Sequence, residues 1–261
     1  MTDPVILTEA RGPVGVLTIN RPKTLNALDV PTLGELDRAF SDYDADPAIR
    51  VIIITGAGER AFVAGGDIAD LNSRQALAHS TEFAEVIHRV FRRIEVSDKP
   101  TIAAVNGWAL GGGTEILLAT DLRLLAETAR LGLPEITLGI IPGAGGTQRL
   151  TRQVPLCRAK EMMFTGRHID AATAVAIGLA NRTVPKDKLM EEAHALAADI
   201  AEKSPLILKL LKRAVREGHD MSLVAGLAYE QAMASLVFDS ADAHEGCTAF
   251  LEKRKPGFVG K

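Results

Sequence analysis

The repeating unit of this chain is clearest at residues 99–116, which read KPTIAAVNGWALGGGTEI. Pro100 precedes Thr101–Val105, a continuous apolar run that predicts a strand buried on both faces. A glycine run, Gly111–Gly113, then leads into Thr114–Ala119, which has the apolar character expected of a buried helix. A strand, a glycine-rich turn and a helix in this order predict an α/β fold.

The same order of elements recurs on both sides of this stretch. Short apolar runs predict strands, and apolar residues spaced by three and four predict helices. The predicted strands are Val14–Asn20, Arg50–Thr55 and Leu122–Ala126, and the predicted helices between them cover residues 32–46 and 80–96. We interpret the unit as strand, turn, short strand and helix, although no sequence motif repeats at a fixed period.

From about residue 157 the pattern becomes helical. The predicted helices cover residues 158–165, 171–178, 186–203, 205–217, 221–238 and 241–253. We therefore divide the chain into an α/β core with the active site, residues 1–195, and a C-terminal helical region, residues 196–261. A helical region of about sixty residues is too small for a core of its own, so we expect it to pack on the body or on another subunit.

Composition excludes several classes of protein. Of the 261 residues, 47% are hydrophobic and 24% are charged, which is typical of globular proteins. A net charge of −3 gives no reason to expect nucleic acid as a partner. Cys157 and Cys247 lie far apart and have no Cys or His at zinc spacing, which argues against a disulfide scaffold and a zinc motif.

Targeting signals are also missing from the sequence. The first twelve residues lack a basic region followed by an apolar stretch, so they do not resemble a secretory signal. The apolar runs are too short to span a bilayer. We therefore expect a cytoplasmic protein with no membrane partner.

Three segments combine glycines with one acidic side chain. They are AFVAGGDI at residues 61–68, NGWALGGGTE at 106–115 and LPEITLGIIPGAGGT at 133–147. Glycines permit tight turns, but they also expose backbone N–H groups to a ligand, above all in front of a helix. The dinucleotide and phosphate-loop motifs do not match, because the mid-chain run lacks the third glycine spacing and no G-x-x-x-x-G-K-[ST] occurs.

Glu115 and Glu135 are lone charges in apolar stretches. A carboxylate in such a place is costly to bury unless it is hydrogen-bonded or used. Glu115 could simply complement a helix dipole, and Glu135 could belong to a surface loop. Two such glutamates, each beside a glycine-rich loop, favour a shared catalytic role.

Four separated motifs give the chain a resemblance to the crotonase (enoyl-CoA hydratase/isomerase) superfamily. They are AFVAGGDI, KPTIAAVNGWALGGGTEI, LPEITLGIIPGAGGTQRL and FLEKRKPGF, and NRPKTLNAL at residues 20–28 adds to them. The resemblance covers essentially the whole chain. It implies a crotonase-like spiral of ββα units followed by helices that trimerise, in a homotrimer or a dimer of trimers.

The resemblance also implies an active site and a reaction. The reaction is the reversible syn addition of water to trans-2-enoyl-CoA, which gives 3-hydroxyacyl-CoA. The oxyanion hole maps onto the N–H groups of Gly66 and Gly112. The acid/base pair maps onto Glu115, as the base that activates water, and Glu135, as the proton donor. Coenzyme A is part of the substrate, and no metal or redox cofactor is implied.

Further residues are carried over with the coenzyme A part of the substrate. The resemblance places it along Lys23, Ala27 and the loop that includes Ala64, Asp67 and Ile68, while Phe250 and Lys253 of a neighbouring subunit close the nucleotide end. The acyl pocket is expected within residues 70–90, with Leu71, Leu77 and Phe83 as candidates. The chain departs from many relatives at Gly66 (often Ala), Ala69 (a Lys in some) and Trp108 (commonly Tyr), and Trp108 is expected to reshape the site wall.

Two other interpretations compete with the hydratase. One is an enoyl-CoA isomerase or a pathway-specific 3-hydroxyacyl-CoA dehydratase that uses the same site; keeping both glutamates favours hydration over isomerisation. The other is a non-catalytic or RNA-associated homologue. That alternative predicts a missing glutamate or a strongly basic face, and the sequence shows neither.

Overall fold

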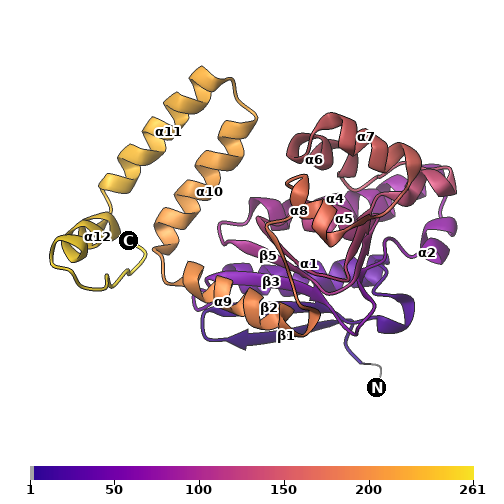
Figure 1. Cartoon of the computed structure of the whole chain (residues 1–261), viewed down its shortest axis with the longest axis horizontal. Helices are drawn as coiled ribbons and strands as arrows, with labels where there is room; N and C mark the ends of the chain where they lie inside the picture. Colours follow the sequence, from indigo (N-terminus) through magenta and orange to yellow (C-terminus); the bar gives the residue numbers. More distant parts are fainter. Residues whose placement is uncertain (1–2) are drawn as a thin grey trace.

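Two β-sheets form the body of the molecule. The computed structural model describes residues 3–261 (Figure 1). The larger sheet has the order β1 (Ile6–Arg11), β2 (Val14–Ile19), β3 (Val51–Gly56), β5 (Thr101–Val105), β7 (Leu122–Ala126) and β10 (Arg182–Val184). The smaller sheet has the order β4 (Ala61–Val63), β6 (Trp108–Leu110), β8 (Arg130–Gly132) and β9 (Ile169–Asp170). Neighbouring strands are parallel except β1 with β2 and β8 with β9.

Successive units contribute one strand to each sheet. β3 is followed by β4, β5 by β6, and β7 by β8, and a helical segment follows each pair. These segments and the helices around them are η1 (Pro22–Thr24), α1 (Val30–Ala45), α2 (Ile68–Asn72), α3 (Ala76–Ala78), the π-helix η2 (His79–Ala84), α4 (Glu85–Val96), α5 (Gly112–Leu118), η3 (Pro134–Leu138), α6 (Gly146–Gln153), α7 (Leu156–Thr165) and α8 (Ala171–Ala176). The predicted spiral of ββα units is confirmed.

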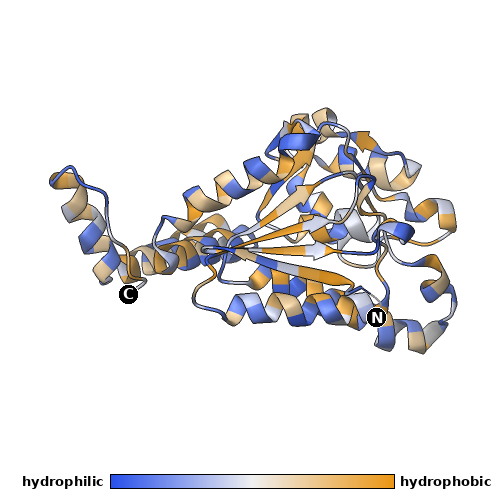
Figure 2. Cartoon of the chain, turned by 90° about the horizontal axis from the view of Figure 1, so that it is seen from below, coloured by the Kyte–Doolittle hydropathy of each residue, from blue (hydrophilic) through white to orange (hydrophobic). Residues whose placement is uncertain are grey.

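The strands β2, β3, β5 and β7 of the larger sheet bury side chains on both faces, as their apolar runs predict. In β3, Ile52 and Ile54 point into the core formed with α1 and α4, whereas Val51 and Ile53 point to the opposite face. That second face is covered by α9 (Leu189–Ala201), which follows the short helix η4 (Lys186–Lys188). Figure 2 shows helices on both sides of the strands, so the sheet is shielded from water on each face.

Packing changes after α9. Ala193, Ala197 and Ala201, spaced by four, lie against the larger sheet, so the predicted boundary near residue 195 falls inside a helix that belongs to the body. The helices beyond residue 204 are α10 (Pro205–His219), α11 (Leu223–Phe238) and α12 (Ala241–Leu251). None of the described residues of α10 and α11 is buried, and these helices extend away from the sheets (Figure 1). Within residues 3–261, no helix is both long enough and apolar enough to cross a membrane.

Candidate active site

The helix α5 carries Glu115 into the interior. It begins after Gly111, whose φ of +51° is a left-handed conformation that favours glycine. Gly113 lies so close to the Val63 carbonyl of β4 that a Cβ atom would overlap it. All seven residues of α5 are buried, and Glu115 is only 3% exposed.

A glycine-rich loop holds the Glu115 carboxylate. Its Oε1 accepts hydrogen bonds from the backbone N–H of Ala144, at 2.7 Å, and of Gly146, at 2.8 Å. Burial raises the pKa of Glu115, while these two N–H groups and the nearby charges of His88 and Arg149 oppose the rise. The pKa of Glu115 stays above its ordinary value, and the loop limits the rise by stabilising the ionised form.

Glu135 lies in η3, beside the N-terminal end of α5. It is half-buried, and a Cβ atom on Gly111 would lie 3.0 Å from its Oε1. Its Oε2 is buried and accepts no hydrogen bond from any residue that the structure describes. Burial raises the pKa of Glu135 to about 7; its own backbone N–H opposes the rise, and the charge of Glu115 adds to it. This carboxyl therefore holds its proton to a much higher pH than an exposed glutamate.

Two backbone N–H groups lie next to the glutamates. The loop of Gly66 is fixed by bonds from the Leu28 N–H to the Gly65 carbonyl, at 2.9 Å, and from the Asp67 N–H to the Leu28 carbonyl, at 2.8 Å. A Cβ atom on Gly112 would lie 3.6 Å from the Gly66 nitrogen, so the two glycines are neighbours. In the described chain, neither the Gly66 nor the Gly112 N–H donates to another residue, which leaves both available to a ligand.

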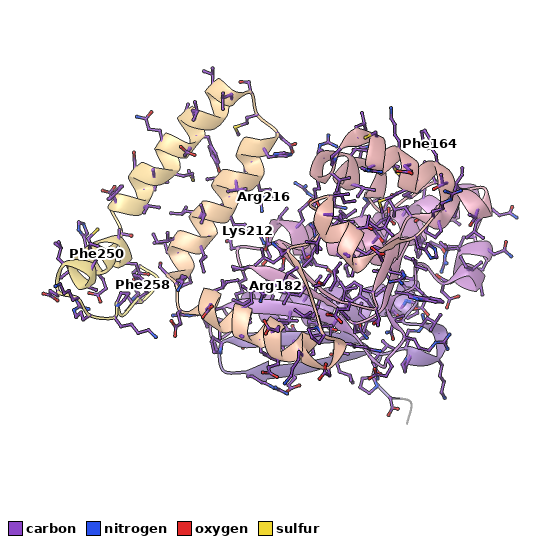
Figure 3. The ribbon with its side chains drawn as sticks, viewed as in Figure 1. Phe164, Arg182, Lys212, Arg216, Phe250 and Phe258 are labelled. Carbon is purple, nitrogen blue, oxygen red and sulfur yellow. The ribbon has the colours of Figure 1, made fainter. Side chains whose placement is uncertain are left out.

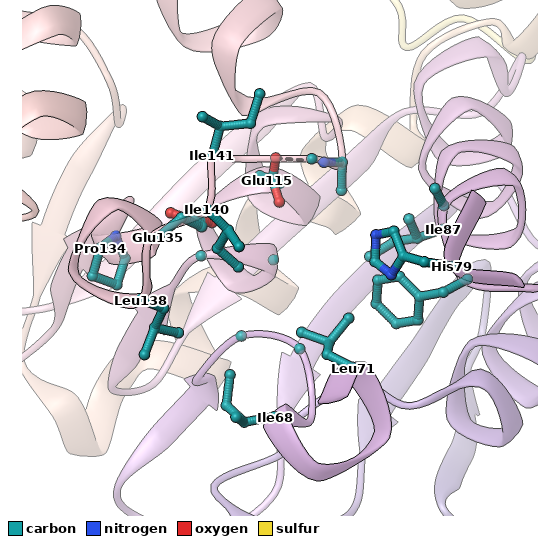
Figure 4. A pocket seen from close by; sticks show the side chains of 18 of the residues that line it. Ile68, Leu71, His79, Ile87, Glu115, Pro134, Glu135, Leu138, Ile140 and Ile141 are labelled. Atoms are coloured by element: carbon teal, nitrogen blue, oxygen red, sulfur yellow. Dashed lines mark hydrogen bonds between the residues drawn. The ribbon is translucent and has the colours of Figure 1, made fainter. Parts of the chain in front are cut away.

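One pocket brings these groups together (Figure 4). Both glutamates and both glycines line it, as do Ala64 and Ile68 of the predicted substrate loop. The remaining lining residues are mostly apolar: Gly65, Leu71, His79, Phe83, Ala84, Ile87, Gly111, Pro134, Leu138, Ile140, Ile141, Gly143 and Ala144. A mainly apolar cleft with a few convergent polar groups is typical of a small-molecule site.

Three predicted coenzyme A residues do not line the pocket. Lys23 is exposed on η1, and Ala27 is buried, with its carbonyl bonded to Arg21. The Asp67 carboxylate caps α2 by accepting from the Ala69 N–H, at 3.1 Å, and pairs with Arg21, at 3.2 Å. The Asp67 side chain therefore serves the local fold.

The C-terminal residues of the predicted site lie far from the pocket of their own chain. Phe250, on α12, is 83% exposed and stands at the opposite end of the molecule from α2 (Figures 1 and 3). Lys253 follows α12 at a positive φ of 57°. A contribution from these two residues to a neighbouring chain's pocket stays a prediction.

The structure corrects two expectations about the pocket wall. Leu71 and Phe83 line the pocket, but Leu77 is 74% exposed and does not. Leu77 lies in the short helix α3, whereas the wall is formed by His79, Phe83 and Ala84 of the π-helix that follows. Trp108 does not line the pocket either, because it begins β6 with its side chain 43% exposed.

Sequence reasoning missed the opposite wall and the loop that holds Glu115. Leu138, Ile140 and Ile141 come from the segment just after Glu135, and the two consecutive isoleucines between glycines are its signal in the sequence. The N–H donors of Ala144 and Gly146 had no signal, because any residue type supplies a backbone N–H. For the residues described, no cluster of three or more His, Cys, Asp or Glu side chains could hold a metal ion.

The sequence is similar to those of known enoyl-CoA hydratases. The model of the family described as enoyl-CoA hydratase/isomerase matches residues 9–261. The chain is 43% identical over 250 residues to a short-chain-enoyl-CoA hydratase of Clostridium acetobutylicum, covering 96% of this chain and 95% of that protein. It is also 43% identical over 256 residues to a crotonyl-CoA hydratase of Syntrophomonas wolfei, covering 98% of each.

Solved structures agree with the sequence relatives. An enoyl-CoA hydratase from Bacillus anthracis superposes with a TM-score of 0.95 at 40% identity, covering 99% of this chain and 100% of the other. At this identity and coverage the likeness extends to the whole chain, including α10–α12.

Proposed function

This chain belongs to the enoyl-CoA hydratase/isomerase family, and we propose that it is an enoyl-CoA hydratase, a hydro-lyase that adds water to trans-2-enoyl-CoA. The addition is reversible and syn, and its product is 3-hydroxyacyl-CoA. One observation carries the proposal: Glu115, Glu135 and the N–H groups of Gly66 and Gly112 line a single, mostly apolar pocket.

The four groups suit the charges that develop in hydration. Attack of water on C3 pushes negative charge onto the thioester oxygen, and the N–H groups of Gly66 and Gly112 are the donors for that oxygen. A preorganised donor of this kind is worth about 3–4 kcal/mol in the transition state. Since both donors are backbone groups, the substitutions among relatives at position 66 leave the chemistry unchanged.

The two carboxyl groups divide the proton transfers between them. Glu115, with one oxygen bonded to two N–H groups, is the base that takes a proton from water. Glu135, with a pKa of about 7 and an oxygen that accepts no hydrogen bond from the described residues, is the acid that delivers a proton to C2. Because the groups influence each other, their titration belongs to the pair.

Substrate binding extends beyond the pocket. We assign the coenzyme A part of the substrate to Lys23, Ala27, Ala64, Asp67 and Ile68, with Phe250 and Lys253 supplied by a neighbouring subunit. Asp67 contributes through its backbone and through the fold of its loop, since its side chain is engaged with Arg21 and α2.

A homotrimer, or a dimer of trimers, accounts for the exposed C-terminal helices. Large apolar side chains on them are uncovered in the single chain: Leu211, Val215, Leu223, Val224, Leu227, Leu236, Phe238, Phe250 and Leu251. Exposed apolar surface of this extent marks an association surface. Light scattering on the purified chain tests this assembly, and a monomer at micromolar concentration contradicts it.

The reaction needs no metal or redox cofactor, because an acid, a base and two N–H donors account for every proton and charge moved. Full activity after dialysis against a chelator is the expected result. Cys157 and Cys247 are exposed and unpaired, which suits the reducing cytoplasm that we propose for this enzyme.

The decisive assay is hydration of crotonyl-CoA, followed by the loss of absorbance of the conjugated thioester. A matched 3-enoyl-CoA is the control, since an isomerase consumes it and a hydratase does not. Turnover of the 3-enoyl substrate alone, without hydration of crotonyl-CoA, contradicts the proposal.

A further inference from the structure

The loop that holds Glu115 is itself held from its other side by Arg149. This arginine lies in α6, and its Nη1 donates to the Ala144 carbonyl at 3.0 Å. The Ala144 N–H, one peptide earlier, is one of the two donors to Glu115. Arg149 and Glu115 therefore bind the same short segment, Ala144–Gly146, the arginine through a carbonyl and the glutamate through N–H groups. We call the contact of Arg149 with this segment the clamp.

The backbone of this segment explains why a clamp is needed. Gly145 has a φ of +106°, which turns the chain so that the N–H groups of Ala144 and Gly146 point the same way while the Ala144 carbonyl points elsewhere. A Cβ atom on Gly145 would overlap Nη1 of Arg149, so the guanidinium lies directly against the turn. Without a partner for the Ala144 carbonyl, this glycine-rich turn loses the contact that opposes its rotation.

Glu95 of α4 orients the guanidinium. Its two carboxylate oxygens accept from Nε and Nη2 of Arg149 at 2.9 and 3.0 Å, a bidentate pair. The Arg149 side chain is only 13% exposed. Burial by itself would raise the pKa of Glu95, but the bond and charge of Arg149, with the charges of Arg92 and Arg216, hold it below its ordinary value. Glu95 is therefore a carboxylate throughout the neutral pH range.

We propose that Arg149 is a positioning residue for hydration, oriented by Glu95: it fixes the Ala144–Gly146 turn so that its N–H groups hold the Glu115 carboxylate in place. The inference rests on the proposed function for its catalytic consequence, but the geometry of the clamp stands apart from it. Neither residue lines the pocket, so the effect on the reaction passes through Glu115.

The charged groups that face Glu115 predict in which direction its pKa shifts when one of them is removed. They are His88 from α4, Arg149 from α6 and Glu135 from η3. Removing the charge of Arg149 withdraws a cation and loosens two N–H bonds, and both changes raise the pKa of Glu115. Glu95→Gln removes the charge but keeps one oxygen that accepts from Arg149, so the arginine stays in place without a counter-charge, which lowers the pKa of Glu115. A role limited to fold stability predicts no such opposed pair of shifts.

The experiment compares Arg149→Met, Glu95→Gln and Arg149→Lys in the full chain, with crotonyl-CoA as substrate. For Arg149→Met we expect kcat to fall by about 10²-fold with little change in KM, the cost of a misplaced catalytic group. The acid limb of its kcat–pH profile moves to higher pH, whereas that of Glu95→Gln moves to lower pH. Arg149→Lys keeps the acid limb of the kcat–pH profile at the wild-type pH and restores part of kcat. Lysine keeps the positive charge but lacks the paired N–H donors of a guanidinium.

Arg213→Met is the matched control. Arg213 of α10 forms a bidentate pair with Asp98, at 2.8 and 3.0 Å, outside the pocket. We expect it to leave kcat and the pH profile unchanged. Equal losses in Arg149→Met and Arg213→Met, or an Arg149→Met enzyme with wild-type kcat and pH profile, overturn the proposal. If Arg149→Met does not fold, the Glu95→Gln shift and the Arg149→Lys rescue decide.

A second readout separates this inference from the proposed function. The carboxyl carbon of Glu115 is followed by NMR in chains labelled at glutamate, and Glu115→Gln identifies the signal. A titration moved to higher pH in Arg149→Met supports the clamp even if crotonyl-CoA is not the substrate. An unmoved titration contradicts the clamp, whatever the activity.

Discussion

The segments that carry the two glutamates have opposite surroundings. In α5 every residue is buried, and Glu115 sits among them with one oxygen bonded to two N–H groups. In η3 no residue is fully buried, and Glu135 has an enclosed oxygen without a partner. Glu115 is thus the more deeply buried carboxylate and also the one that receives more hydrogen bonds from the protein. Glu135 is less buried and receives fewer.

This contrast shows how one residue type serves two roles. Fixed donors that replace water favour the ionised form of a buried carboxylate, as the Ala144–Gly146 turn does for Glu115. A carboxyl without such donors, and near another negative charge, keeps its proton, as Glu135 does with a pKa of about 7. The carboxyl with fixed N–H donors is thus the better base of the pair, and the one without them is the better acid.

The largest effect is expected from Glu115→Gln. An amide cannot take a proton from water, so kcat should fall by about 10⁴-fold, at the upper end of general-base contributions. The steady-state rate with crotonyl-CoA measures the loss, and circular dichroism verifies the fold. A loss smaller than that of Glu135→Gln would reverse the roles that we assign.

Glu135→Gln should lower kcat by about 10³-fold, because the acid that protonates C2 is gone. In the wild type, activity should decline as pH rises through about 7, where Glu135 loses its proton. The residual activity of the variant should not show this decline. A kcat–pH profile of both enzymes checks the prediction. The same alkaline limb in both would assign it to another group.

The raised pKa of Glu135 has a consequence for stability. Its folded-state pKa exceeds the unfolded value, so its favourable contribution is complete below about pH 4.5 and is lost as pH rises through about 7. Glu135→Gln should therefore unfold at a higher temperature than the wild type at pH 8, with the difference shrinking toward pH 4. Calorimetry at both pH values measures this, and a pH-independent difference would contradict it.

Gly146→Ala should displace the Glu115 carboxylate and leave Glu135 in place. A Cβ atom there would lie 2.9 Å from Oε1 of Glu115 and 3.0 Å from Cβ of Pro142, so the carboxylate must move. We expect kcat to fall by about 10- to 100-fold, the range for a displaced catalytic group. Gly34→Ala on α1 is the control, because its Cβ atom would meet nothing within 4 Å and Gly34 does not line the pocket. Equal losses in both variants would show that the effect is not specific to Glu115.

The smallest effect is expected from Gly66→Ala, which touches neither glutamate. The new Cβ atom would meet Cδ1 of Leu71 at 2.9 Å, the far end of a flexible side chain, and the donating N–H remains. The free energy of unfolding should fall by about 1–3 kcal/mol at most. The rate of crotonyl-CoA hydration should stay near that of the wild type. A loss as large as that of Gly146→Ala would mean that the oxyanion site has less room than the structure shows.

The elements of the body were largely predictable, because they follow the two periodicities of buried chains. Arg50–Thr55 predicted β3 by a continuous apolar run, and residues 32–46 predicted α1 by a spacing of three and four. Short elements were harder to predict, since β4, β6 and β8 have three residues each and show no period. β1 escaped notice because five of its six residues are exposed.

The site divides in the same way. Glu115 and Glu135 were visible as lone charges in apolar surroundings, and the motif resemblance paired them with Gly66 and Gly112. The choice of Leu77 was wrong because nothing in the local sequence separates this exposed leucine of the short helix α3 from Leu71 and Phe83, which line the pocket. The partners of Glu115 lie 29 and 31 residues away and act through backbone atoms, which leave no mark in a sequence.

The sequence by itself determined which residues carry the chemistry and which kind of fold presents them. Residue type and local spacing suffice for this, since a charge in an apolar run and a glycine before a helix are local features. The tertiary structure decided how the two like carboxyls differ. That difference depends on which N–H groups, arginines and apolar walls enclose each one, and these come from distant parts of the chain that only folding brings together.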